Sequence, residues 1–310
     1  MIILIIALMI LTSACGKSQE PAGEPVDGGE KIKIVTTVFA SYDWTRNLIR
    51  GQEDRFDLVF LTDSGVDLHS FQPGVSEVAA VTDCDLLIRT GGESESFIDD
   101  IIEGGTFDGR VINMLDILGD RAILIDGEEG REPDEHVWMS LRNAEEFSGG
   151  ICEALKELDS ENAGTYEENL KAYLAELQEL DGEYAALADG GMTDVVIGDR
   201  YPFIYLFEDY GIGCFAAFTG CSSETDASFE TVTSLAKKVD ELGLKYVLTV
   251  EGSDGKVAQA IINVTETGDQ EILELDSMQQ VSRSDIDQGK TYISAMKADL
   301  ETLRKVGEKN

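Results

Sequence analysis

The chain has 310 residues, with 61 acidic and only 24 basic side chains, so its formal net charge at pH 7 is −37. This composition argues against a nucleic-acid partner, because phosphate contacts need a basic face. The acidic field attracts cations in general but does not select one of them. The length is sufficient for two domains of ordinary size.

The N-terminus begins with an unbroken apolar run from Ile2 to Leu11, followed by small residues and Cys15. Ten residues span about 15 Å as a helix, about half the hydrocarbon core of a bilayer. We therefore expect residues 1–15 to be a lipoprotein signal peptide with lipidation at Cys15. The alternative is an ordinary N-terminal hydrophobic helix.

Residues 16–30 are rich in glycine and contain two prolines and almost nothing to bury, so they predict a flexible tether. Every later apolar run is shorter than the eighteen or so residues that a membrane span needs. The sequence thus predicts a body outside the cytoplasm, held at the outer face of the cell membrane by lipid.

Eight short apolar runs rich in β-branched residues predict strands in the body of the chain. They cover residues 32–38, 56–61, 86–90, 111–115, 195–198, 214–218, 246–250 and 272–275. Most of the segments between them, such as 232–242, have apolar residues at helical spacing. Strands that alternate with helices predict parallel sheets covered on both faces. Because the runs form two groups of four, we predict two doubly wound α/β lobes, residues 31–158 and 191–310.

Between the two groups, residues 161–188 carry apolar side chains at steps of three or four, without proline. We expect Asp159 or Ser160 to cap the first turn. Gly182 is the weak position, costing about 1 kcal/mol relative to alanine. A helix of this length extends for about 40 Å. The sequence therefore predicts one long rigid helix, at residues 159–190, that joins the lobes and limits them to modest rocking.

Five cysteines are present, and four remain beside Cys15: Cys84, Cys152, Cys214 and Cys221. Outside the cytoplasm four cysteines can form two disulfides in three pairings. Cys84 adjoins an apolar strand, which also suits a buried thiol. The sequence leaves these alternatives open.

Histidine occurs only twice, at His69 and His136, and each follows a predicted strand of the first lobe with a carboxylate two residues before it. In the second lobe, Asp199 and Asp276 each end a predicted strand. Ligands of open α/β sheets bind beyond the carboxyl ends of the strands. Singly, such residues are usually solvated loop histidines or capping carboxylates. As a set of four, two in each lobe, they predict a metal site.

Three motifs around these residues occur in a recognisable order. They are Asp67-x-His69-x-Phe71-x-Pro73, Asp134-x-His136-x-Trp138 and Leu275-Asp276-Ser277. On these motifs the chain, over residues 31–305, resembles the zinc- and manganese-binding lipoproteins of ABC importers, in which a long helix joins two α/β lobes. The resemblance implies a monomeric, non-enzymatic protein that delivers a metal ion to a membrane permease and its cytoplasmic ATPase. It also implies that His69, His136 and Asp276 bind the ion.

The chain departs from this family at the third ligand, where relatives have histidine or glutamate. Counting back from the aromatic-rich stretch that ends at Tyr210 reaches Arg200. Arginine stays protonated, cannot bind a cation and repels a dication. Asp199 is the nearest substitute ligand, Glu224 the second and Glu251 the third, and we expect Arg200 to pair with one of the unused acids.

Two imidazoles with one or two carboxylates favour tetrahedral Zn²⁺, and Mn²⁺ or Fe²⁺ is the alternative within the same class. Because a histidine must lose its proton to bind metal, we expect affinity to fall below about pH 6.5. The histidine-rich loop of some relatives is replaced by residues 126–132, an acidic segment that we expect to be solvated.

Three further interpretations remain open. A metallohydrolase would use an open zinc position, but the chain has no H-E-x-x-H and no nucleophile motif. Arg200 is also consistent with a protein that has lost metal binding. Some relatives are described as adhesins, so a second role in adhesion stays open.

Overall fold

The structure is a computed structural model that describes residues 30–105, 107–126, 130–192, 194–218 and 227–308. The expected signal peptide, Cys15 and nearly all of the expected tether lie outside these residues, as do Cys221 and Glu224.

The first lobe is built on a fully parallel sheet with the strand order β2–β1–β3–β4. Its strands are β1 (Ile32–Thr36), β2 (Phe56–Phe60), β3 (Leu86–Arg89) and β4 (Arg110–Asn113). All four residues of β3 are buried, as expected for a central parallel strand that is covered on both faces. Each predicted run of this lobe overlaps one of these strands, although β4 begins one residue before the fourth run and the end of that run belongs to a helix.

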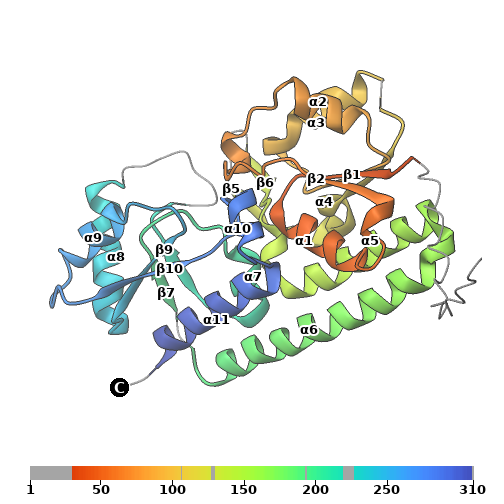
Figure 1. Ribbon diagram of the computed structural model, residues 1–310. Helices are drawn as coiled ribbons and strands as arrows, with labels where there is room; N and C mark the ends of the chain where they lie inside the picture. Colours follow the sequence, from red (N-terminus) through yellow and green to blue (C-terminus); the bar gives the residue numbers. More distant parts are fainter. Residues whose placement is uncertain (1–29, 106, 127–129, 193, 219–226, 309–310) are drawn as a thin grey trace, which may run out of the picture. The chain divides into compact units, whose positions relative to one another are not determined.

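Helices cover both faces of this sheet, with α2 and α3 on one side and α1 and α5 on the other (Figure 1). Their bounds are α1 (Phe39–Leu48), α2 (Val75–Thr82), α3 (Ser96–Glu103), α4 (Met114–Leu118) and α5 (Leu141–Leu158). Short 3₁₀ turns connect them: η1 (Glu53–Arg55), η2 (Leu68–Ser70), η3 (Glu93–Glu95), η4 (Gly119–Arg121), η5 (Val137–Met139) and η6 (Ser160–Asn162).

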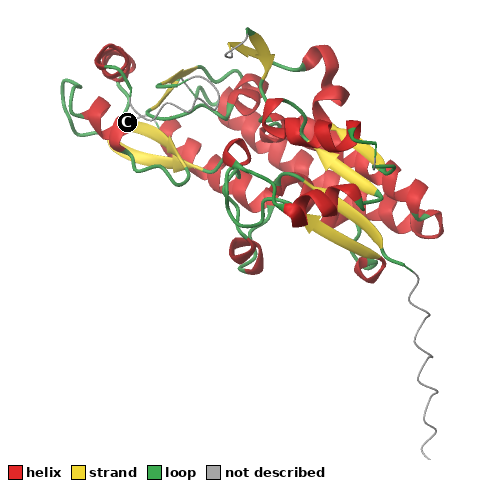
Figure 2. Ribbon diagram, turned by 90° about the horizontal axis from the view of Figure 1, so that it is seen from above, coloured by secondary structure: helices red, strands yellow, loops and turns green. Residues whose placement is uncertain are grey.

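The second lobe repeats this topology, with the parallel order β10–β9–β7–β8. Its strands are β7 (Val195–Ile197), β8 (Cys214–Ala216), β9 (Tyr246–Val250) and β10 (Glu271–Leu275). Its helices are α7 (Ile204–Tyr210), α8 (Phe229–Leu242), α9 (Lys256–Ile262), α10 (Arg283–Asp287) and α11 (Tyr292–Gly307). In both sheets the first strand lies between the second and the third, and the main strands form two separate groups (Figure 2). The predicted fold class is confirmed.

The connection between the sheets is α6 (Ala163–Asp189), a helix of 27 residues and so about 40 Å long. Its buried side chains, Tyr166, Tyr173, Leu177, Leu180 and Tyr184, follow the predicted three-and-four spacing. The long linking helix is confirmed, while the extent of lobe motion stays a prediction.

The predicted cap of this helix is wrong. The first α-helical residue follows the turn η6, and its N-cap, Asn162, makes no side-chain capping bond. The Asp159 carboxylate instead accepts hydrogen bonds from Arg55 Nε at 2.7 Å and from the Tyr166 hydroxyl at 2.6 Å. A guanidinium gives a stronger, charge-assisted bond than a backbone N–H does, so tertiary structure overrides the local capping signal.

An antiparallel strand pair that the sequence did not predict precedes His136. It consists of β5 (Leu124–Asp126) and β6 (Arg131–Pro133). The expectation of a solvated loop over residues 126–132 is therefore only partly right. His136 also follows β6 directly, rather than the fourth predicted strand.

The two lobes share one hydrophobic core cluster, which contains both Ile34 of β1 and Val195 of β7. Tyr292, the first residue of α11, connects them further: its backbone N–H donates to Asp43 of α1 at 2.9 Å, and its hydroxyl donates to the Trp138 carbonyl at 2.7 Å. The lobes are thus joined by packing as well as by α6.

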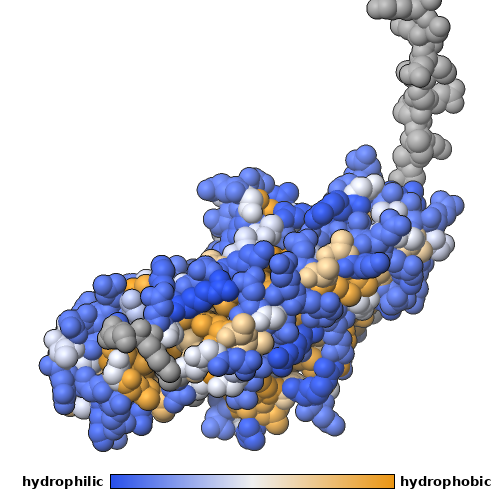
Figure 3. All heavy atoms as spheres, turned by 90° about the horizontal axis from the view of Figure 1, so that it is seen from below, coloured by the Kyte–Doolittle hydropathy of each residue, from blue (hydrophilic) through white to orange (hydrophobic). Residues whose placement is uncertain are grey.

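Cys84, Cys152 and Cys214 are free thiols. Every two-disulfide pairing of the four cysteines needs a bond between two of these three, so those pairings are excluded. Cys84 and Cys152 belong to different core clusters, which keeps them apart. Within the described ranges, no helix has both the length and the apolar character needed to cross a membrane. Hydrophilic residues dominate the face in Figure 3, with apolar areas between them.

Candidate metal site

The structure brings the two histidines together, although 67 positions separate them in the chain. His69 Nε2 lies 3.4 Å from His136 Nε2, and the ring centroids are 5.4 Å apart. His136 is 1 % exposed. The two imidazoles therefore present their Nε2 atoms to one small, sheltered volume.

His136 is oriented by Asp134, which lies just beyond β6. Asp134 Oδ1 accepts hydrogen bonds from the backbone N–H and from Nδ1 of His136, both at 2.9 Å. An ionised carboxylate is only an acceptor, so Nδ1 carries the proton and Nε2 keeps its lone pair. Such a carboxylate–histidine pair is the usual support of a metal-binding imidazole.

His69 sits in the turn η2, which Asp67 caps in the same way: Asp67 Oδ1 accepts from the His69 N–H at 3.0 Å. Here a different group holds Nδ1, the Ser94 hydroxyl at 2.5 Å. Glu135 Oε2 is 3.8 Å from the same nitrogen, and Glu135 Oε1 accepts from the Ser94 N–H at 3.0 Å. Glu135 thus ties the turn η3 to the loop of the other histidine.

Burial is the main cause that lowers the pKa of His69 to about 4, and the neighbouring His136 lowers it further. His69 is therefore neutral at physiological pH, the form that binds metal. Burial also raises the pKa of Glu135. The expected loss of affinity below about pH 6.5 assumed an ordinary histidine, and for His69 it moves to more acidic conditions.

The second lobe faces the histidines with the turn that follows β10. Glu251, at the end of β9, accepts from the N–H and hydroxyl of Ser277 and from the N–H of Gln279. Met278, between these two, has φ 61°, the one positive value recorded for a residue other than glycine among those described. This conformation costs about 1–3 kcal/mol. It places Gln279 so that its Nε2 is 2.9 Å from His136 Nε2.

The predicted carboxylate ligands of this lobe have other partners. Asp276 Oδ2 contacts Lys290 Nζ at 2.5 Å, and its Oδ1 accepts from the Met278 N–H at 2.9 Å. Asp199 accepts from the Arg200 N–H at 2.8 Å and from the Ser253 hydroxyl. Within the described part of the chain, no three histidine, cysteine, aspartate or glutamate side chains are grouped closely enough to hold a metal ion. The full ligand set therefore remains a prediction, and Glu224 lies outside the described residues.

Arg200 pairs with Asp67 of the first motif, which is not one of the substitute acids proposed from the sequence. Its Nη1 donates to Asp67 Oδ2 at 3.0 Å, and the two side chains are 24 % and 10 % exposed. The position at which a third ligand was expected from the sequence thus carries a cation, which pairs with the first lobe two residues before His69.

Sequence reasoning missed Ser94, Gln279 and Lys290, and it did not consider Glu135. Glu135 had a local signal, because it is an acid adjacent to His136. The other three had none, since Ser94 is 25 positions from His69 and Gln279 is 143 positions from His136.

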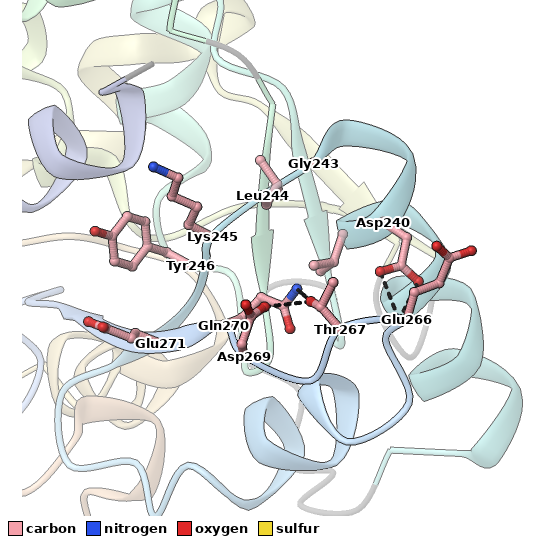
Figure 4. Close-up of a pocket in the computed structure, with 11 residues that line it drawn as sticks. Asp240, Gly243, Leu244, Lys245, Tyr246, Glu266, Thr267, Asp269, Gln270 and Glu271 are labelled. Atoms are coloured by element: carbon pink, nitrogen blue, oxygen red, sulfur yellow. Dashed lines mark hydrogen bonds between the residues drawn. The ribbon is translucent and has the colours of Figure 1, made fainter. Parts of the chain in front are cut away.

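A separate pocket of about 440 Å³ lies at the opposite end of the second sheet, where β9 and β10 begin (Figure 4). Both oxygens of the Asp240 carboxylate accept from the Glu266 N–H at 3.1 Å, and Asp269 accepts from the Thr267 hydroxyl at 2.5 Å. These contacts tie Asp240 of α8 to the loop before β10 and fix Asp269 within that loop, away from the histidines.

Comparison with known proteins gives this geometry its context. The family described as zinc-uptake complex component A, periplasmic, matches residues 34–306. The chain belongs to this family. It is 27 % identical to the high-affinity zinc uptake system protein ZnuA of Bacillus subtilis (strain 168), over 97 % of this chain and 95 % of that protein.

It is also 25 % identical to the zinc-binding protein AdcA of Streptococcus pyogenes serotype M1, over 97 % of this chain but only 61 % of that protein. The Zn(II)-bound ZnuA-like domain of Streptococcus pneumoniae AdcA has the same fold, with a TM-score of 0.73 at 24 % identity, covering 90 % of this chain and all of that domain. The family is one of metal-uptake components and not of enzymes, which makes the metallohydrolase interpretation unnecessary.

Proposed function

We propose that this protein captures Zn²⁺ outside the cytoplasm and delivers it to the permease and ATPase of an ABC importer. Family membership over residues 34–306 supports the transport role. The relatives named as zinc-uptake and zinc-binding proteins support the choice of ion. A lipid on Cys15 and the tether of residues 16–30 would hold the protein at the membrane.

The observation that carries the proposal is the 3.4 Å separation of the two histidine Nε2 atoms. Two imidazole nitrogens bound to a tetrahedral zinc at about 2.0–2.1 Å lie about 3.3 Å apart. The two imidazoles can therefore share one tetrahedral zinc, and Mn²⁺ is the alternative cargo.

The remaining ligands would come from the second lobe. Asp276 is the predicted last ligand in the chain, and to bind it must leave Lys290. Gln279 must move away from His136 Nε2, because it occupies the lone pair that the ion needs. Asp199 is the predicted substitute for the third ligand, and Glu224 is the second candidate. Two carboxylates would neutralise the dication and ease its desolvation.

The test is a competition titration of the purified protein with Zn²⁺ and a chelator of known affinity, together with metal analysis of the protein as purified. We expect one ion per chain, with Zn²⁺ preferred to Mn²⁺. No binding of either ion, with the fold intact by circular dichroism, would instead support a protein that has lost its metal.

A further inference from the structure

We infer that Arg200 lowers the affinity of the protein for its ion. Its permanent positive charge repels the bound ion, and it pairs with Asp67, which caps the turn that carries His69. This inference rests on the proposed metal-binding function and deepens it. It concerns how tightly the cargo is held, and hence how readily it is released.

The first step is the place of the ion pair. Arg200 follows β7 in the second lobe, and Asp67 caps the turn that carries His69 in the first. Four residues before Asp67, the Asp63 carbonyl accepts from the Arg283 N–H of the second lobe at 2.7 Å. The loop that leads to His69 thus contacts the second lobe at both positions, and the Arg200–Asp67 pair is largely shielded from solvent.

The second step is that one carboxylate serves two purposes. Asp67 Oδ1 holds the backbone N–H of His69, while Oδ2 accepts from the guanidinium of Arg200. An ion on His69 Nε2 would therefore be bound by a loop that also carries the positive charge of Arg200. Like charges repel more strongly where solvent screening is weak.

The third step is that Arg200 cannot relieve this repulsion by losing its proton, because a guanidinium stays protonated in proteins. Only movement of Arg200 or weaker metal binding can relieve the repulsion. If binding of the ion weakens the Arg200–Asp67 pair, then by thermodynamic linkage the pair weakens binding of the ion to the same extent. A lower affinity is useful to a carrier that must release its ion.

The experiment compares Arg200→Gln and Arg200→Met, which remove the charge, with Arg200→Lys, which keeps it. Arg121→Gln is the matched control, because Arg121 forms an exposed pair with Glu146. The readouts are the Zn²⁺ dissociation constant by chelator competition, the rate of Zn²⁺ release to excess chelator, and the melting temperature of the metal-free protein.

We expect both neutral variants to bind Zn²⁺ about tenfold more tightly than the parent protein and to release it more slowly, as a coupling of ordinary size requires. Their metal-free melting temperature should fall, because an interlobe ion pair is lost. Arg200→Lys and Arg121→Gln should retain the parent affinity. A purely structural role for Arg200 would lower the melting temperature without tightening the binding.

Unchanged or weaker Zn²⁺ binding in the neutral variants that fold, with binding intact in the parent, would overturn the inference and leave the proposed function standing. Absence of binding in the parent and in all variants would instead overturn the proposed function, and the inference with it.

Discussion

The two lobes differ in how far their predicted ligand side chains are already oriented to bind an ion. In the first lobe, both imidazoles have their Nδ1 atoms held by Asp134 or Ser94, and their Nε2 atoms converge. In the second lobe, the predicted ligand Asp276 is paired with Lys290. The difference suggests that the first lobe forms the entry site for the ion, and that the second lobe must rearrange to complete its coordination.

The two Asp-x-His motifs of the first lobe also differ from each other in the partners of their aspartates. Both aspartates accept from the backbone N–H of the histidine two residues later. Asp134 uses the same oxygen for the imidazole, whereas Asp67 turns its second oxygen to Arg200. An identical local motif therefore has two electrostatic roles, decided by the neighbour that tertiary structure supplies.

The largest effect should come from removing a histidine of the prepared lobe. His136→Ala deletes a ligand, so Zn²⁺ binding should weaken by more than the roughly 100-fold that loss of a supporting partner can cost. Chelator competition measures it. Gln279→Ala is the control, because it removes the hydrogen bond to His136 Nε2 and the one from the Ser277 hydroxyl but no predicted ligand, and it should leave binding equal or tighter. Retained affinity in His136→Ala would show that His136 of the first lobe is not a ligand of the ion.

A smaller loss is expected when a histidine stays but its support is removed. Ser94→Ala leaves His69 Nδ1 without its 2.5 Å partner, and Zn²⁺ affinity should fall about tenfold. Ser96→Ala, a change of the same kind at the exposed start of α3, should have no effect on the titration. Equal affinities for both variants would show that Ser94 does not orient the ring.

A gain is expected in the second lobe. Lys290→Gln frees Asp276 from its ion pair, in which both side chains are about a quarter exposed. Because Asp276 is more exposed than Asp67 in its pair, the loss of Lys290 should raise Zn²⁺ affinity only by roughly three- to tenfold. The control Lys238→Gln removes the same charge from a pair with Glu241 on α8. A loss of affinity in Lys290→Gln would mean that Lys290 positions Asp276 for the ion.

A separate effect concerns the stability of the metal-free protein as a function of pH. The pKa of His69 is about 4 in the folded protein, below the value of about 6.5 in an unfolded chain. The unfolded state therefore takes up the proton first, and metal-free stability should fall as the pH drops from about 6.5 towards 4. Denaturant unfolding at several pH values measures this, and the slope should decrease in His69→Gln. An identical slope in the variant would contradict the buried, neutral His69.

Much of the fold could be predicted because its signals are local. Strands such as β3 are continuous apolar runs, and α6 keeps its helical spacing for 27 residues. The two histidines were predictable as a pair because each belongs to an Asp-x-His motif at a loop.

The rest depends on partners that are distant in the chain. Asp159 reads as a helix cap, but Arg55, 104 positions away, takes its carboxylate. Lys290 and Gln279 carry no local sign that they contact Asp276 and His136. Which acids are available to a metal is decided by these tertiary ion pairs, and a sequence pattern does not contain them.

The most direct measurement is a crystal structure of the Zn²⁺-loaded protein with anomalous scattering recorded at the zinc absorption edge. We predict one anomalous peak bonded to Nε2 of both His69 and His136, with Asp276 released from Lys290 as a further ligand. A peak elsewhere in the molecule, with the two imidazoles still in contact and no ion between them, would contradict the account.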